Sequence, residues 1–304
     1  MMYDIGFPNL GIWLENIKDG FSIGGFEIKF YGMIIACGFL LAYNFVSREA
    51  VRTGQNPENY LDYLLWMIVP AIIGARLYYV IFSASSFFKP GQSFWDTVKG
   101  IMNIRGGGLA IYGGVIVGVL VLIIFASKRK LSIPQMLDTA VMGLLIGQIL
   151  GRWGNFFNRE AFGGYSDGLF AMAIPVSFFE QKGSVAFLVR QGIITQEMVN
   201  KIMRYSGAEF IQVHPTFLYE SVWNLALLII IFLYRKNKKF EGELFLMYLW
   251  GYGLGRVWIE GLRSDSLMIG GMKASQLLAA LCVIVASCLI AWKRLQLKRE
   301  KVNE

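Results

Sequence analysis

The chain has 304 residues, of which 55% are hydrophobic and only 16% are charged, and its formal net charge at pH 7 is +8. Soluble domains carry about 25% charged residues, so this composition indicates a membrane protein. The excess of positive charge could suggest a nucleic-acid partner, but the basic residues cluster in short segments between apolar runs, so no nucleic acid is expected. A single histidine and the lack of Cys/His pair spacing argue against a metal site.

The N-terminal segment, residues 1–28, precedes the first long apolar run. Phe7, Leu10, Trp13, Leu14 and Ile17 recur at helical spacing. This spacing predicts an amphipathic helix at the membrane interface.

Seven apolar runs follow, each close to the length of about 20 residues that a membrane-spanning helix needs. Helices are predicted because backbone groups in lipid must be hydrogen-bonded within the segment. The predicted fold is therefore an all-α polytopic membrane protein with about seven spans. Their approximate bounds are 30–47, 60–84, 109–127, 133–151, 216–234, 244–262 and 274–292.

Basic residues concentrate in alternate connections between these runs. They lie at 48–52, 128–130, 235–239 and 293–301, whereas the opposite connections are poorer in lysine and arginine. The positive-inside rule therefore predicts an N-terminus outside the cell and a C-terminus in the cytoplasm.

The connection between the fourth and fifth runs is too long for a plain loop. It contains a predicted strand, "LFAMAIPV", and a predicted helix, "TQEMVNKIMRY". We therefore predict one membrane domain, residues 1–304, with a small extracytoplasmic cap, residues 153–215, inserted into it.

Polar residues within the spans gather at one predicted depth. Charged side chains in a membrane are costly and mark functional sites. Asp138 alone is predicted toward the cytoplasmic end. The residues predicted near the outer ends are Tyr31, Arg76, Tyr112, Arg152, Glu220, Arg256, Glu260 and Arg263.

The sixth run places Tyr252, Arg256, Glu260 and Arg263 on one helix face, at spacings of four, four and three. One interpretation is an internal ion-pair ladder that holds helices together. Two arginines at one depth, with tyrosines and glycines nearby, favour an anion site, because guanidinium groups bind phosphate through paired hydrogen bonds. A phosphate at this depth is most simply a phospholipid head group.

Glycines precede the third run in "RGGGLAIYGG" (Arg105–Gly114). They allow the backbone to approach a ligand or another helix closely, and both interpretations can hold. The fifth run opens with "HPTFLYE", in which His214 by itself is more typical of a structural role than of a catalytic one.

Together these blocks resemble the prolipoprotein diacylglyceryl transferase family. The resemblance rests mainly on "GRWGNFFNREAFG" (Gly151–Gly163). Further blocks in family order cover essentially the whole membrane portion: "FYG" (30–32), "GAR" (74–76), "GGLAIYGG" (107–114), "HPTFLYE" (214–220) and "GYGLGRVWIEGLR" (251–263).

The resemblance implies transfer of the diacylglyceryl group of phosphatidylglycerol to the thiol of the lipobox cysteine in a preprolipoprotein, with release of glycerol phosphate. It implies no cofactor, neither metal nor nucleotide. The expected partners are this lipid, preprolipoprotein signal peptides and the bilayer. The expected location is the bacterial cytoplasmic membrane, which the chain would cross several times.

The resemblance also implies roles for individual residues. Arg152 and Arg256 would hold the lipid phosphate and stabilise charge as it departs, with Glu160 and Glu260 as further catalytic residues. The other residues, expected to bind substrate or shape the site, are Tyr31, Arg76, Gly107, Gly108, Asn155, Asn158, Gly163, His214, Tyr252 and Arg263.

Tyr112 departs from the family pattern, since many relatives have histidine at this position. A tyrosine with a pKa of about 10 is a poor base at neutral pH, so Tyr112 is expected to position or hydrogen-bond the substrate. The incoming thiol has an ordinary pKa of about 8.5, which nearby arginines would lower. Glu160 or Glu260 could take its proton.

Two other classes of function compete with the transferase. A transporter or flippase for an anionic lipid could use the same arginines, but it would need polar residues across the full membrane depth. A scaffold protein would need no cluster of intramembrane charges. Without the resemblance, the residues support a membrane protein with an outer-leaflet anion site and leave the reaction open.

Overall fold

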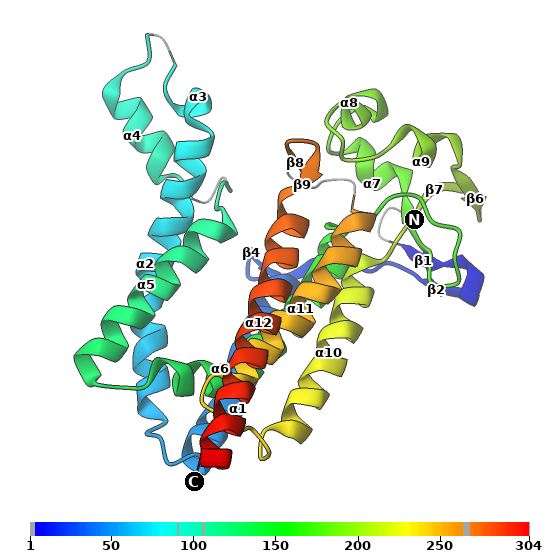
Figure 1. Cartoon of the computed structure of the whole chain (residues 1–304). Coiled ribbons are helices and arrows are strands. Elements are labelled where there is room, and N and C mark those ends of the chain that lie inside the picture. Colours follow the sequence, from blue (N-terminus) through cyan, green and yellow to red (C-terminus); the bar gives the residue numbers. More distant parts are fainter. Residues whose placement is uncertain (1–3, 90, 105–106, 264–267, 304) are drawn as a thin grey trace. The chain divides into compact units, whose positions relative to one another are not determined.

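The computed structural model describes residues 4–89, 91–104, 107–263 and 268–303, and it is mostly helical (Figure 1). Six of its helices are long and apolar enough to cross a membrane, which agrees with a polytopic membrane protein. They are α1 (Phe30–Arg52), α2 (Glu58–Phe82), α5 (Ile111–Arg129), α6 (Ile133–Asn158), α10 (Thr216–Tyr234) and α12 (Ala274–Asn303).

A seventh predicted span coincides with α11 (Glu243–Leu262), which has 20 residues. It is not among the six apolar helices, because four glycines, several aromatic residues, Arg256 and Glu260 reduce its apolarity. Its length fits a span. The total of seven spans therefore stays a prediction.

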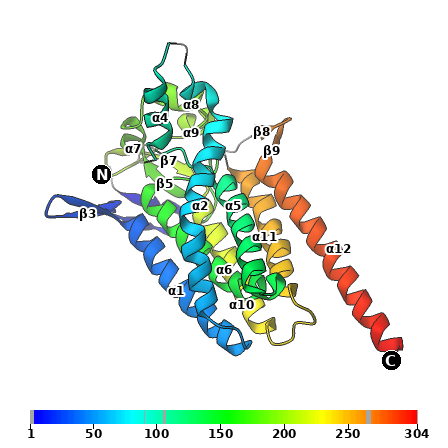
Figure 2. The same cartoon turned by 90° about the vertical axis from the view of Figure 1, so that its left-hand side faces the viewer.

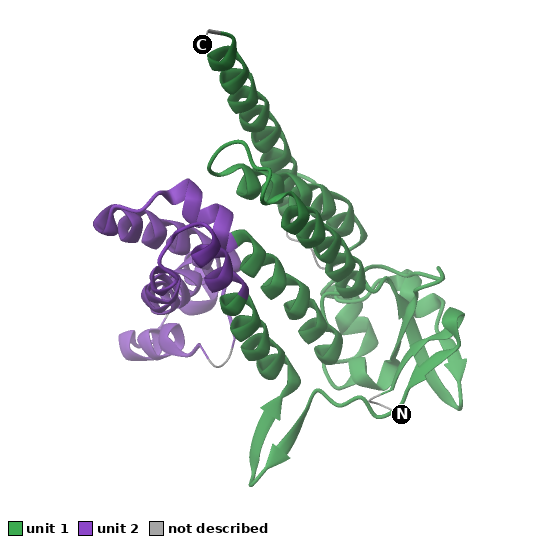
Figure 3. Ribbon diagram, turned by 90° about the horizontal axis from the view of Figure 1, so that it is seen from below, with its two compact units in different colours: residues 1–44, 141–304 green, residues 45–140 purple. Residues whose placement is uncertain are grey.

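The chain divides into two compact units, which Figure 3 colours separately: residues 45–140, and residues 1–44 together with 141–304. The smaller unit contains α2, α5 and two short helices, α3 (Ala84–Phe87) and α4 (Phe94–Met102). In it, α2 and α5 pack closely because Gly74 and Gly113 face each other: a Cβ atom on Gly113 would lie 2.3 Å from the carbonyl oxygen of Gly74. The predicted single membrane domain with its inserted cap stays a prediction.

The larger unit combines helices with a small five-stranded sheet of order β2-β1-β5-β7-β6. The strands pair antiparallel, with Met172 opposite Val213 and Gly6 opposite Ala173. Three short helices accompany the sheet: α7 (Val176–Glu180), α8 (Val185–Arg190) and α9 (Gln196–Asn200). The strands are β1 (Ile5–Phe7), β2 (Ile12–Leu14), β5 (Met172–Pro175), β6 (Met203–Tyr205) and β7 (Ala208–Val213).

The sheet and its short helices lie at one end of α6, α10 and α11 (Figures 1 and 2). Their hydrophobic core includes Ile5, Met172 and Ile211, and it continues into the helix ends through Phe156 and Phe217. This continuity fixes the sheet against the helix ends that carry the polar residues.

Several local predictions need correction. The N-terminal segment is not an amphipathic helix: it forms β1, a short 3-10 turn (Pro8–Leu10), β2 and the hairpin of β3 (Gly20–Ile23) with β4 (Phe26–Lys29). The fold is therefore not purely α. The predicted strand "LFAMAIPV" is confirmed by β5, whereas "TQEMVNKIMRY" is helical only over α9 and ends in β6. A second hairpin, β8 (Met268–Ile269) with β9 (Met272–Lys273), precedes α12.

Candidate active site

Arg152 and Arg256 come together on one carboxylate in the larger unit. Arg152 lies in the last two turns of α6, and its Nη2 lies 2.5 Å from Oε1 of Glu220 on α10. Arg256 on α11 places its Nη1 3.1 Å from Oε2 of the same glutamate. The Glu220 side chain is 3% exposed, and those of Arg152 and Arg256 are 21% and 16% exposed. Three helices thus meet at a buried ion-pair cluster whose cations keep some access from outside.

Glu260 and Tyr252 extend this cluster along α11. The spacing of four residues on each side of Arg256 puts both on its face of the helix. Arg256 Nη2 lies 2.5 Å from Glu260 Oε2, and the Tyr252 hydroxyl lies 3.5 Å from Glu220 Oε1. The ion-pair ladder considered from the sequence is therefore present, and it includes the two arginines expected to bind an anion.

The end of α6 links the cluster to Glu160. Arg152 Nη1 donates to Asn155 Oδ1 at 3.2 Å. The amide nitrogens of Asn155 and Asn158 both donate to Glu160 Oε1, at 2.9 and 3.2 Å. A chain of polar contacts therefore runs from Arg152 to the exposed carboxylate of Glu160.

The loop after Glu160 is attached to the ends of two other helices. The Gly163 N–H donates to the carbonyl of His214 at 2.9 Å, and the Gly164 N–H donates to the carbonyl of Leu262 at 2.8 Å. A Cβ atom on Gly163 would lie 2.7 Å from His214 Cβ and 2.8 Å from the Leu262 oxygen, so only glycine fits here. Arg263 pairs with Gly163 in an isolated β-bridge. Gly163 and Arg263 therefore lie together where α6, α10 and α11 meet the sheet.

His214 precedes α10, and its Nδ1 lies 3.4 Å from the Tyr219 hydroxyl. Burial lowers the pKa of its imidazole below the ordinary value of 6.5, and the charge of Asp167 opposes this shift only in part. A neutral histidine follows at physiological pH. Its backbone contacts to the Gly163–Gly164 loop show a structural role, and its expected role in substrate binding stays a prediction.

Tyr31, at the start of α1, packs against the same end of α6. A Cβ atom on Gly154 would lie 2.3 Å from the Tyr31 ring, so glycine at this position makes room for the ring. The ring is partly exposed. Tyr31 thus lies next to the polar end of α6, and its expected role in substrate binding stays a prediction.

Arg76 belongs to the smaller unit, and its guanidinium is hydrogen-bonded to backbone carbonyls. Its guanidinium donates to the carbonyls of Gly100, Ile101 and Asn103, and to those of Gly107 and Gly108, at 2.8 to 3.1 Å. Gly107 and Gly108 have φ of +87° and +78°, and a Cβ on Gly108 would lie 2.5 Å from Arg76 Nη1. These glycines let the backbone approach the Arg76 side chain closely. The expected role of Arg76, Gly107 and Gly108 in substrate binding stays a prediction.

Tyr112 lies in the first turn of α5, also in the smaller unit. Its ring is 6.3 Å from that of Tyr78, and its side chain is half-buried. Its catalytic role stays a prediction.

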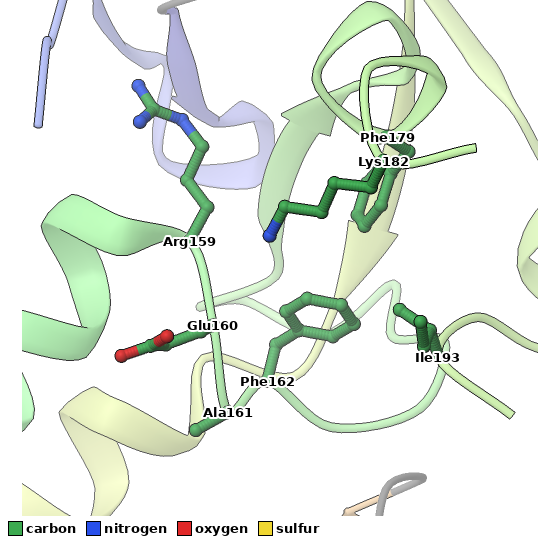
Figure 4. A pocket seen from close by; sticks show the side chains of 7 residues that line it. All are labelled: Arg159, Glu160, Ala161, Phe162, Phe179, Lys182 and Ile193. Atoms are coloured by element: carbon green, nitrogen blue, oxygen red, sulfur yellow. The ribbon is translucent and has the colours of Figure 1, made fainter. Parts of the chain in front are cut away.

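A cavity of about 130 Å³ opens beside the loop that follows α6 (Figure 4). Lys182 directs its amino group toward the Arg159–Glu160 backbone in this view. Burial lowers the pKa of Lys182, and the charge of Glu160 partly opposes the shift. The lining residues are Arg159, Glu160, Ala161, Phe162, Phe179, Lys182 and Ile193.

Two residues at this site had no assigned role in the sequence analysis. Glu220 was recognised only as an intramembrane charge, although it joins the two arginines. Lys273 was not singled out, yet its Nζ donates to the carbonyls of Glu260, Gly261 and Arg263 at 2.5 to 3.0 Å. It therefore satisfies carbonyls that the C-terminal end of α11 leaves unpaired.

The cluster can bind an anion. Each terminal nitrogen of a guanidinium carries two N–H groups, so contacts with Glu220 and its neighbours leave further donors on Arg152 and Arg256. Two cations in a partly buried setting can stabilise negative charge that develops on a phosphate.

Comparison with known proteins agrees with this chemistry. Residues 19–292 match the family model described as prolipoprotein diacylglyceryl transferase. Two relatives named phosphatidylglycerol–prolipoprotein diacylglyceryl transferase are each 38% identical to this chain. The match to the relative from Halalkalibacterium halodurans covers 90% of this chain and 84% of the relative. The match to the relative from Lysinibacillus sphaericus covers 91% of this chain and 92% of the relative. A relative from Clostridium perfringens with the same name, numbered 1, is 38% identical over 87% of this chain and 90% of its own. The chain therefore belongs to the prolipoprotein diacylglyceryl transferase family.

Proposed function

We propose that the chain transfers the diacylglyceryl group of phosphatidylglycerol to the thiol of a lipobox cysteine and releases glycerol phosphate. Membership of the family supports this reaction, because its named relatives carry it in their names. The observation that carries the proposal is the pair of partly exposed arginines held on one buried glutamate, Glu220.

The topology that suits this reaction has seven spans, α11 included, with the sheet and its short helices outside the cell. In the larger unit, the arginine cluster and the sheet share one end of α6, α10 and α11. Basic residues lie at the other end, at 235–239 after α10 and at 293–301 in α12. The positive-inside rule then puts the cluster in the outer leaflet of the bacterial cytoplasmic membrane.

The lipid phosphate binds between Arg152 and Arg256 in this proposal. Glu220 and Glu260 neutralise the two cations before the lipid arrives and hold their side chains in place. The phosphate then accepts from the remaining guanidinium N–H groups. Such preorganised donors stabilise charge without rearranging during the reaction.

In the transfer step, the cysteine sulfur forms a bond to the glycerol carbon that carries the phosphate. The bond between this carbon and the phosphate oxygen breaks, and its electron pair stays on the departing glycerol phosphate. Glu160 is the better acceptor for the thiol proton, because it is exposed and held by two amides, whereas Glu260 is buried against Arg256. Tyr112 positions the substrate, since its phenol is a poor base.

The test is a transfer assay with purified protein in detergent, phosphatidylglycerol and a lipobox peptide, followed by mass spectrometry. The peptide gains a diacylglyceryl group, and replacing its cysteine with serine prevents the gain. Arg152→Ala and Arg256→Ala reduce transfer by about 100-fold or more, and lysine at either position restores only part, because it lacks the guanidinium fork. Arg204→Ala, at an exposed ion pair in β6, is the matched control.

Normal transfer by either alanine variant would refute the phosphate-binding role of that arginine. No transfer by the wild type, with lipid still bound in an Arg152-dependent manner, would favour a lipid transporter or flippase.

A further inference from the structure

Helices α6 and α10 run antiparallel where they meet. Arg152 meets Glu220 at one end of the contact, and Leu145 shares a buried core with Leu227 two turns away. Between these two points the chain advances seven residues along α6 and seven residues back along α10. The register therefore places Gln148 and Asn224 at one level, one turn from the arginine cluster; we call this pair the amide layer.

Both amides of this layer are buried and incompletely hydrogen-bonded. Asn224 is 0% exposed, and within the described part of the chain neither its Oδ1 nor its Nδ2 has a hydrogen-bond partner. Gln148 donates from Nε2 to the Tyr248 hydroxyl at 2.7 Å, while its buried Oε1 has no partner among the same residues. The layer therefore holds hydrogen-bonding capacity that protein atoms do not use.

Such a layer is costly inside a helix bundle in lipid. An amide without a partner loses its hydration and gains nothing in return. The need for a hydrogen-bond partner is greatest for the Asn224 N–H groups. Buried donors without an acceptor are rarer in proteins than buried carbonyls without a donor. The Asn224 Nδ2 group of the layer therefore needs an oxygen acceptor, whereas Asn224 Oδ1 and Gln148 Oε1 can each accept a further donor such as a water.

The position of the layer indicates which acceptor arrives. Four residues of helix correspond to about 6 Å, so the layer lies that far from the arginines on the side away from the sheet. In a phospholipid, the ester carbonyls follow the phosphate on the side of the acyl chains, separated from it by the glycerol backbone. Gly147, the neighbour of Gln148 in the chain, is exposed, and a Cβ on it would meet no atom within 4 Å.

We propose that Asn224, with Gln148 beside it, donates to an ester carbonyl of the lipid whose phosphate Arg152 and Arg256 bind. This inference rests on the proposed function. It makes the amide layer a subsite that selects diacyl over dialkyl lipids. The carbonyl has no part in the bond changes of the transfer step, so the subsite acts through binding and position alone.

The test compares phosphatidylglycerol with its dialkyl ether analogue, which keeps the reacting bond and lacks the carbonyls. The wild type prefers the ester lipid by about 3- to 10-fold in kcat/KM, the effect of one neutral hydrogen bond. In Asn224→Leu this ratio falls to about 1. Leu227→Met, one turn further along α10, is the matched control and keeps the wild-type ratio.

A second readout keeps the inference separate from the reaction. Displacement of a fluorescent lipid from the protein in detergent measures the ester-to-ether ratio in binding, without transfer. This measurement tests the proposed subsite even if the wild type transfers nothing. Asn224→Ala and Gln148→Met repeat the measurement if Asn224→Leu does not fold. An ester-to-ether ratio that stays at the wild-type value in every folded Asn224 variant would overturn the proposal and assign the layer to a bound water.

Discussion

Arg152 and Arg256 bind opposite oxygens of one carboxylate, that of Glu220, from two different helices. This arrangement fixes the separation of the two guanidinium groups before any substrate binds. Glu260 restrains Arg256 from a second side, and Asn155 restrains Arg152. A phosphate then meets donors that are already oriented, which is the condition under which electrostatic stabilisation is largest.

Replacing Glu220 with glutamine tests this arrangement. The change leaves two partly buried cations with less compensation, and losing one partner of a buried ion pair costs about 3–5 kcal/mol of stability. We expect a large drop in melting temperature in detergent, together with weaker transfer. Glu209→Gln, in the exposed pair with Arg204, changes the melting temperature little. Unchanged stability of Glu220→Gln would mean that the arginines keep their positions without it.

Replacing Gly163 with alanine tests the attachment of the loop. The added Cβ would lie 2.8 Å from a backbone oxygen, that of Leu262, which cannot rotate away. We expect a loss of about 1–3 kcal/mol in stability and reduced transfer. The neighbour offers a close control, because a Cβ on Gly164 would lie 3.8 Å from the same oxygen, an ordinary contact. Equal melting temperatures for the two variants would contradict the predicted clash.

The pH dependence of stability tests the burial of His214. Its pKa is lower in the folded protein than the ordinary 6.5, so the unfolded chain binds the proton more readily. Stability contributed by the neutral imidazole is therefore complete above pH 6.5 and is lost as the pH falls toward the lowered pKa. His214→Asn, which keeps a polar group near Nδ1, removes this component from a melting curve measured across pH. Parallel pH profiles of stability for the variant and the wild type would exclude a contribution of His214 to the pH dependence.

Replacing Arg76 with methionine separates a structural role from lipid binding. The variant leaves five backbone carbonyls without their donor, so a loss of about 3 kcal/mol or more in stability is expected. The KM for phosphatidylglycerol, measured on the folded protein in the transfer assay, stays near the wild-type value. A raised KM with an unchanged melting temperature would instead place Arg76 on the lipid.

The long helices were predictable from the sequence, because about 20 apolar residues in lipid leave the backbone no other paired structure. The strand at "LFAMAIPV" was predictable from its short apolar run. The N-terminal segment was not, since the spacing of Phe7, Leu10 and Trp13 suits a helix, and pairing of β1 with the distant β5 decides otherwise. Such non-local pairing leaves no local signal.

In the candidate site, too, features set by local spacing were predictable, and features set by contacts between distant segments were not. The face of α11 that carries Arg256 and Glu260 follows from spacing alone. The role of Glu220 depends on side chains from three helices meeting at one point. The contacts of Arg76 are with backbone carbonyls, which any sequence would supply, so no residue pattern could reveal them.

The arginine cluster also has a consequence for how the chain is made. Its members leave the ribosome in the order Arg152, Glu220, Arg256, so the first arginine is synthesised one long connection ahead of its carboxylate. Because an unpaired guanidinium in hydrocarbon costs free energy, we expect α6 to reach its final position only after α10 has been inserted. A nascent chain truncated before α10 would therefore leave Arg152 of α6 without its Glu220 partner, and we expect such a chain to insert α6 less stably.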